Sequence, residues 1–295
     1  MDKTPRREFL KTSALALAGT AILPSTVQDL ANPVRHLGLQ LYSVRDDMVK
    51  DPVGTIKAIA QMGYREVEGY GYKDGKMFGM PFAEYIKVLK NNGLIMPSSH
   101  CNFSLSDYDE GAKGLTDRAK RAIDDAVAMG QKYIIFPWLT EQERPEVVKI
   151  VRLVSAGADY AQKAGIRFGY HNHDFEFLQR GPDGRLLLEW LLQEIDPKKL
   201  AMEMDIYWVC HAGYNPLDWF RLYPGRWELC HAKDQAATEK RETIEFGDGT
   251  IDFSGIFRQS KLAGLQRYII ELEHYRTTPL EGVKRARANF LKTKW

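Results

Sequence analysis

The sequence predicts a single (β/α)8 barrel, and two local patterns support this fold class. From about Arg35 onward, short apolar runs alternate with amphipathic stretches, which is typical of parallel strands connected by helices. Five predicted helices end in a glycine that an apolar strand follows at once, at Gly63, Gly93, Gly130, Gly165 and Gly264. Glycine caps a helix in the left-handed conformation, so the chain turns directly into the next strand.

Eight apolar runs are predicted to be the strands: Leu37–Leu41, Glu66–Glu68, Ile95–His100, Tyr133–Phe136, Phe168–His171, Leu200–Asp205, Glu228–His231 and Tyr268–Glu271. Eight parallel strands with intervening helices close into a barrel rather than an open sheet. The segment Gly181–Arg185 is predicted to be a tight turn, and no linker or change of composition divides the chain after its N-terminal segment. The predicted barrel therefore covers residues 36–292 as one domain.

Residues 1–30 are predicted to be an export leader. The arginine pair Arg6-Arg7 precedes an apolar run from Ala14 to Leu23, a pattern that resembles a twin-arginine signal. The alternative is a basic amphipathic helix. The apolar run is too short for a comfortable membrane span, so we expect no transmembrane span once the leader is removed. The prediction is a protein exported to the periplasm, tethered to the membrane if the leader is retained.

The composition is that of a soluble globular protein, because 44% of the 295 residues are hydrophobic and 27% are charged. A net charge of +2 gives no basic field of the kind that nucleic-acid partners require. The three cysteines, Cys101, Cys210 and Cys230, are too few and too scattered for a disulfide framework or a CxxC metal site. A homo-oligomer stays an open alternative.

Polar residues gather where the predicted strands end. In a barrel of this kind, the C-terminal ends of the strands form the functional face. Four of the seven histidines fall there, and ionisable groups directly follow nearly every apolar run. The residues at these ends are Gln40, Glu68, His100, His171, His173, Asp205, His231, Lys233, Glu271 and Glu273. Buried charge is costly unless it is paired or bound to metal, so this placement indicates a site rather than a core.

The alternation of side chains along a strand sharpens this prediction. Residues two apart share a face, which pairs His171 with His173, Glu203 with Asp205, His231 with Lys233 and Glu271 with Glu273. Any one of these residues alone would more often be a satisfied core or rim residue. Carboxylates and imidazoles that converge from neighbouring strands form a mixed oxygen and nitrogen site, suited to one divalent ion such as Mn, Zn, Co or Mg.

Several motifs, in this order, resemble the sugar phosphate isomerase/epimerase family. They are Gly38–Ser43 (GLQLYS), Tyr170–Phe177 (YHNHDFEF), Met204–Trp208 (MDIYW), His231–Asp234 (HAKD), Gly247–Asp252 (GDGTID) and Ile269–Glu271 (IIE). The family has a xylose-isomerase-like barrel and includes ketose 3-epimerases and inosose dehydratases. The resemblance covers about residues 36 to 292.

The resemblance implies one divalent metal, held at the ends of strands five to eight by a Glu, an Asp, a His and a Glu. Carried over by position, three of these ligands are Asp205, His231 and Glu271. The first position departs from the pattern, because His171 stands there with His173 on the same face. Either His171 is the fourth ligand, or the site has three protein ligands and water.

The resemblance also implies proton abstraction beside a carbonyl, with a metal-stabilised enediolate. Because the first glutamate is missing, symmetric two-glutamate epimerisation is not supported, whereas isomerisation and β-elimination or hydration of a keto-sugar stay open. The candidate bases are Glu271, His173 and Lys233, and Glu68 or Lys233 would hold substrate hydroxyls. Further candidates for substrate binding are Gln40, His100 and the aromatic Trp208.

Three functional classes follow from these observations. The first is a metal-dependent isomerase, epimerase or lyase acting on a neutral keto-sugar or cyclic polyol. The second is a non-catalytic carbohydrate-binding barrel. The third is an abasic-site endonuclease-like hydrolase, which the small net charge and the lack of Lys and Arg clusters at strand ends disfavour. The expected partner is therefore a small carbohydrate and not nucleic acid.

Overall fold

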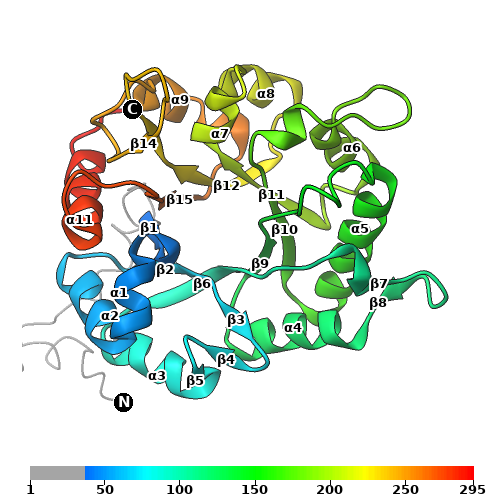
Figure 1. Cartoon of the computed structure of the whole chain (residues 1–295), viewed down its shortest axis with the longest axis horizontal. Coiled ribbons are helices and arrows are strands. Elements are labelled where there is room, and N and C mark those ends of the chain that lie inside the picture. Colours follow the sequence, from blue (N-terminus) through cyan, green and yellow to red (C-terminus); the bar gives the residue numbers. More distant parts are fainter. Residues whose placement is uncertain (1–36) are drawn as a thin grey trace, which may run out of the picture. The chain divides into compact units, whose positions relative to one another are not determined.

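The computed structural model describes residues 37–295, so the predicted leader lies outside the described residues. Eight parallel strands form a closed barrel in the order β1-β15-β12-β11-β10-β9-β6-β2 (Figure 1). The strands are β1 (Leu37–Gln40), β2 (Glu66–Gly69), β6 (Ile95–His100), β9 (Tyr133–Phe136), β10 (Arg167–His171), β11 (Leu200–Asp205), β12 (Trp227–Ala232) and β15 (Arg267–Ile270). The predicted fold class is confirmed, and every predicted strand is present with bounds that agree to within one residue.

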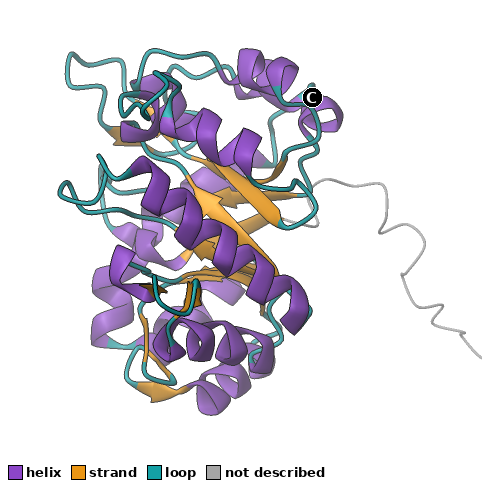
Figure 2. Cartoon of the chain, turned by 90° about the vertical axis from the view of Figure 1, so that its right-hand side faces the viewer, coloured by secondary structure: helices purple, strands orange, loops and turns teal. Residues whose placement is uncertain are grey.

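Helices surround the strands on the outside of the barrel (Figures 1 and 2). They are α1 (Arg45–Lys50), α2 (Pro52–Gln61), α3 (Phe82–Asn91), α4 (Asp117–Ala128), α5 (Val147–Ala164), α6 (Leu187–Glu194), α7 (Ile206–His211), α8 (Pro216–Leu222), α9 (Phe253–Phe257), α10 (Ser260–Ala263) and α11 (Pro279–Phe290). None of the helices within residues 37–295 has an apolar stretch long enough to cross a membrane.

The loops that follow β2, β6 and β12 contain short antiparallel strands that the sequence patterns did not predict. These are β3 (Tyr72–Lys73), β4 (Lys76–Met77) and β5 (Met80–Pro81), then β7 (Tyr108–Asp109) with β8 (Gly114–Leu115), and β13 (Asp234–Gln235) with β14 (Thr243–Ile244). Three 3-10 turns also occur in loops: Leu41–Val44, Phe175–Phe177 and Leu105–Asp107. These segments build up the face of the barrel at which the strands end.

The predicted glycine turns are confirmed. All five glycines have positive φ angles, from 67° at Gly93 to 93° at Gly63. Gly165 ends α5 in the left-handed conformation, at φ 87° and ψ 16°, and β10 begins two residues later. A side chain at such a φ angle would be strained, so glycine fixes the point where the helix stops and the strand starts.

Apolar side chains fill two parts of the core. The larger part lies between the strands and the helices, and a smaller cluster of buried side chains is formed by Tyr133, Ile135, Ala201, Leu229 and Ile269. These five residues come from β9, β11, β12 and β15, so they form an apolar layer inside the barrel. Gly169 of β10 completes this layer because a Cβ atom there would lie 2.2 Å from Ile135 Cδ1.

The cysteines are all unpaired. Cys101 and Cys230 are buried, whereas Cys210 is partly exposed. Burial raises the pKa of the Cys101 thiol to about 12 and that of Cys230 well above its ordinary value.

Candidate metal centre

An ionisable layer lies directly beyond the apolar layer on the same faces of four strands. The same-face runs are Gly169-His171-His173, Ala201-Glu203-Asp205, Leu229-His231-Lys233 and Ile269-Glu271-Glu273. The register pairs Asp205 with His231, and His231 with Ile269, which brings these side chains together across β11, β12 and β15. Along these four strands, the side chains inside the barrel are therefore apolar in the middle and ionisable toward the C-terminal ends.

The predicted metal ligands converge. Donor atoms of Asp205, His231 and Glu271 all lie within 4.8 Å of one another. His231 Nδ1 is 3.0 Å from Glu271 Oε2 and 3.9 Å from Asp205 Oδ2. His171, the predicted fourth ligand, places Nε2 3.8 Å from the same Asp205 oxygen. Two carboxylates and two imidazoles thus approach one region, as a divalent cation requires.

The local fold fixes the orientation of Asp205. This residue ends β11 and is the N-cap of α7, where its Oδ1 accepts a hydrogen bond from Trp208 N at 3.1 Å. Asp205 N donates to Asn172 Oδ1 at 3.2 Å. One carboxylate oxygen therefore holds the helix, while Oδ2 faces the imidazoles.

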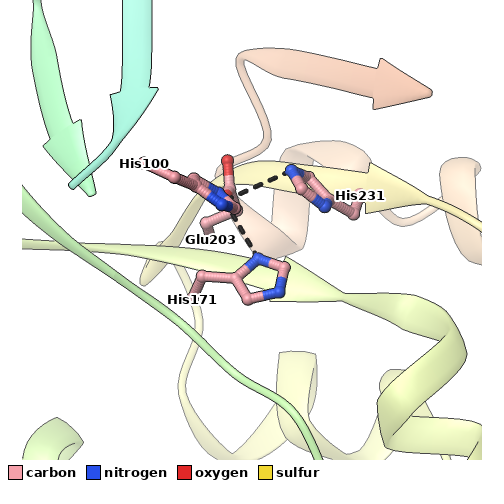
Figure 3. A group of neighbouring side chains, drawn as sticks. All are labelled: His100, His171, Glu203 and His231. Atoms are coloured by element: carbon pink, nitrogen blue, oxygen red, sulfur yellow. Dashed lines mark hydrogen bonds and ion pairs between the residues drawn. The ribbon is translucent and has the colours of Figure 1, made fainter. Parts of the chain in front are cut away.

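A second group of possible ligands shares His231 with the first. It consists of His100, His171, Glu203 and His231 (Figure 3). Glu203 Oε2 lies 2.9 Å from His100 Nε2, 3.0 Å from His171 Nδ1 and 3.3 Å from His231 Nε2. The sequence identified Glu203 only as the same-face neighbour of Asp205, and that parity is the signal that could have placed it in the site.

Glu68 and Gln40 lie in the buried part of this network. Glu68 Oε1 is 2.7 Å from His231 Nε2 and 3.2 Å from His100 Nε2, and it accepts a hydrogen bond from Gln40 Nε2 at 2.8 Å. Both side chains are buried, and neither lines the cavity described below. Glu68 therefore contacts predicted site histidines, rather than the space that a substrate would occupy.

Lys233 lies among the carboxylates of the first group. Its Nζ is 2.6 Å from Glu271 Oε2, 2.7 Å from Glu273 Oε1 and 3.0 Å from Asp205 Oδ2. Burial opposes the charge of this fully buried ammonium, but the three carboxylates raise its pKa well above the ordinary value. Lys233 thus forms ion pairs with two of the predicted metal ligands, Asp205 and Glu271.

The charge balance of the site fits a bound cation. The buried carboxylates of Glu68, Glu203, Asp205 and Glu271 face one lysine and several imidazoles. Glu68 Oε2 and Glu203 Oε1 are buried without a hydrogen-bond partner. Burial, reinforced by Glu68, raises the pKa of Glu203 to about 7. Against the effect of burial, the neighbouring carboxylates raise the pKa of His100 to about 9 and that of His231 well above its ordinary value, so a bound divalent ion would take the place of protons at this site.

The site histidines differ in protonation, because carboxylates raise the pKa of His231 well above its ordinary value against the effect of burial, whereas the pKa values of His171 and His173 are lowered. Burial, followed by the charges of His231 and His100, lowers the pKa of His171 well below its ordinary value. Burial and then Lys233 do the same for His173. Both imidazoles are therefore neutral near neutral pH, which suits a metal ligand and a general base.

A cavity of about 680 Å³ opens onto this layer, within the usual range for small-ligand sites. The predicted site residues that line it are His100, His171, His173, Trp208 and Glu271. Aromatic rings form much of its wall, including Tyr42 and Trp138, which are 42% and 44% exposed. Such exposed ring faces are suited to stacking on the apolar faces of sugars.

His173 stands inside an aromatic enclosure at this cavity. Its ring centroid is 4.8 Å from that of Trp138 and 5.4 Å from that of Trp208. Its Nδ1 is buried without a hydrogen-bond partner. Arg144 packs over Trp138, with Cζ 4.7 Å from the ring centroid.

The family follows from a match to residues 56–294, which cover the barrel described above except for β1 and the first helical turns. The chain belongs to the xylose isomerase-like TIM barrel family. This family assignment agrees with the closed barrel and with the resemblance seen in the motifs.

Two proteins with named activities are similar to this chain. A sugar phosphate isomerase/epimerase from Parabacteroides distasonis is 27% identical, with a TM-score of 0.76 over 87% of this chain and 97% of that chain. An inosose dehydratase from Lacticaseibacillus casei is 26% identical over 148 residues, 44% of this chain and 48% of the dehydratase. The chain thus matches about half the length of the curated relatives.

A more distant structure has the same fold. The IolI protein is 13% identical, with a TM-score of 0.65 over 88% of this chain and 97% of that chain. Its structure contains a bound zinc atom. At this level of identity, the likeness establishes the fold.

Proposed function

We propose that the protein is a metal-dependent isomerase, epimerase or lyase that removes a proton beside the carbonyl of a keto-sugar or cyclic polyol. The observation that carries this proposal is the convergence of Asp205, His231 and Glu271, of which Glu271 lines the same cavity as His171 and His173. The relatives named as a sugar isomerase/epimerase and an inosose dehydratase support the same substrate class.

The residues that would hold the ion are His171, Asp205, His231 and Glu271. A divalent cation bound by them polarises carbonyl and hydroxyl oxygens of the substrate and so acidifies the neighbouring C–H bond. Two imidazole nitrogens and two carboxylate oxygens suit Zn, Co or Mn better than Mg, which prefers oxygen ligands alone.

Proton transfer is assigned to His173 and Glu271, which both line the cavity. A neutral His173 can accept the substrate proton, and the carboxylate of Glu271, which directly follows β15, can also accept one. In a dehydration, the base takes the α-proton and, now protonated, gives it to the departing hydroxyl, which leaves as water. In an isomerisation, the proton returns to the neighbouring carbon.

The aromatic wall supplies binding and orientation. Tyr42, Trp138 and Trp208 offer ring faces, while Glu141 and Arg144 add polar groups at the same cavity. Enclosure by these rings also limits the access of water to a substrate carbanion, which would otherwise be quenched.

The test is solvent isotope exchange. The purified protein, loaded in turn with Mn, Co and Zn, is incubated in deuterated water with unphosphorylated keto-sugars and ketones of cyclic polyols, and NMR follows the carbon-bound protons. We expect deuterium to enter beside the carbonyl, or an elimination product to form, with at least one substrate. Tight binding of these compounds with no exchange or elimination would instead establish a carbohydrate-binding barrel.

A further inference from the structure

Glu203 is a fully buried carboxylate that takes no part in the proposed reaction. It lies in β11, two residues before Asp205, and it does not line the cavity. Its Oε2 is 3.0 Å from His171 Nδ1, and it is the carboxylate hydrogen-bonded to that nitrogen (Figure 3). Glu203 thus contacts a proposed metal ligand from the side away from the other ligands.

His171 has a different partner at each ring nitrogen. Nδ1 faces Glu203, whereas Nε2 lies 3.8 Å from Asp205 Oδ2, among the proposed ligand atoms. A neutral imidazole carries one N–H and one lone pair, so the group that accepts the N–H decides which nitrogen is free to bind a metal. With Nδ1–H donating to Glu203, the lone pair lies on Nε2.

His231 is held in a similar way by a different residue. Its Nε2 is 2.7 Å from Glu68 Oε1 and 3.3 Å from Glu203 Oε2, while Nδ1 faces Glu271 at 3.0 Å. The shorter contact assigns this imidazole mainly to Glu68. Each ligand histidine therefore has a different buried glutamate as its nearest glutamate on this side, although both glutamates also contact His100 Nε2.

We propose that Glu203 is the positioning residue of His171: it accepts the Nδ1–H and so directs the Nε2 lone pair to the cation. A carboxylate behind a ligating imidazole fixes the ring and its tautomer and increases its basicity. This inference rests on the proposed cation site.

The inference also accounts for the departure of this chain from the family pattern. The resemblance implies a glutamate where His171 stands. An imidazole in that position carries no negative charge of its own. Glu203, its register partner in the neighbouring strand, is hydrogen-bonded to it and so returns a carboxylate to the same side of the site.

Metal affinity provides the first test. Isothermal titration with zinc, measured on Glu203→Leu, is expected to show binding weaker by roughly ten- to hundredfold, the usual cost of losing such a contact. Glu203→Gln keeps a carbonyl oxygen that can accept the Nδ1–H, so its loss should be smaller. The control is Glu176→Gln. Glu176 is a buried glutamate that accepts a hydrogen bond from Tyr170 Oη and contacts no ligand histidine, so this variant should bind zinc as the wild type does.

A double-mutant cycle and NMR separate positioning from a general structural effect. Glu203→Leu should cost little further affinity when His171 is already alanine. Long-range proton–nitrogen spectra of the zinc-loaded protein, with His171 assigned from His171→Ala, should show the proton on Nδ1, and the visible spectrum of the cobalt form should change in Glu203→Leu.

Two outcomes would overturn the inference and are distinct from failure of the site itself. A proton on His171 Nε2, or wild-type zinc affinity in Glu203→Leu while Asp205→Asn binds poorly, contradicts the positioning role alone. Wild-type affinity in both Glu203→Leu and Asp205→Asn contradicts the proposed cation site.

Discussion

Asp205 offers a way to remove a ligand without disturbing the fold. Its Oδ1 caps α7, whereas Oδ2 faces the imidazoles. Asparagine also caps helices well but carries no charge. We expect Asp205→Asn to melt near the wild-type temperature and to lose activity. Its affinity for divalent metal should fall by more than roughly a hundredfold, which is more than the loss of a contact behind a ligand usually costs. Calorimetry measures the melting temperature, and titration of the same sample measures the metal affinity. Undiminished metal binding would exclude Asp205 as a ligand.

Lys233 competes with a cation for the same oxygens, because its ammonium lies 2.6 Å from Glu271 Oε2 and 3.0 Å from Asp205 Oδ2. We expect Lys233→Met to bind zinc more tightly than the wild type while its turnover falls. Titration with metal and an activity assay measure the two effects separately. Lys199→Met, which removes a surface lysine paired with Asp159, is the control and should change neither. Weaker zinc binding in Lys233→Met would show that the ammonium supports the site instead.

Strand-end position was enough to predict that His171, Asp205, His231 and Glu271 meet, because closure of a barrel brings the ends of its strands together. It was not enough to place Glu68 and Glu203 at the right depth. The ladder register shifts between Glu66 and Glu68 and between Met202 and Glu203. The extra residues lie in the partner strands β12 and β6, so they change which residues lie opposite Glu203 and Glu68, and no pattern within one strand reveals this.

At the scale of elements, the eight barrel strands could be predicted because most of them contain a short apolar run and five of them follow a helix-ending glycine. The hairpins in the loops after β2, β6 and β12 could not, because strands of two residues have no period to detect. Their pairing depends on loop geometry, which the tertiary structure decides.

The apolar layer under the site leaves no room beside Gly169. Gly169 lies two residues before His171, and a methyl group on it would be 2.2 Å from Ile135 Cδ1. We therefore expect Gly169→Ala to destabilise the protein by about 1–3 kcal/mol, as overpacking usually does. Denaturant unfolding measures this change in the free energy of unfolding. Adding Ile135→Val, which removes the clashing atom, should recover part of the loss; no recovery would place the strain elsewhere.

At the scale of the whole molecule, we propose export through the twin-arginine pathway. Arg6 and Arg7 precede the apolar run of the leader. Lysine keeps the positive charge but not the planar guanidinium. We expect the double change Arg6→Lys and Arg7→Lys to leave the protein in the cytoplasm. Fractionation of cells that express each form, followed by immunoblotting, is the measurement, and full periplasmic or membrane recovery of the double variant would refute the proposal.

The three unpaired thiols have a consequence for where the barrel can mature. The pKa values of the Cys101 and Cys210 thiols are raised to about 12, and that of Cys230 is well above its ordinary value, so none of the three forms much thiolate near neutral pH. Thiol–disulfide exchange needs the thiolate, and buried thiols are also hard for oxidants to reach. Because the three cysteines form no disulfide bond in this structure, folding of the barrel requires neither an oxidant nor a disulfide isomerase. The same barrel can therefore be completed in a reducing compartment and persist unchanged in an oxidising one.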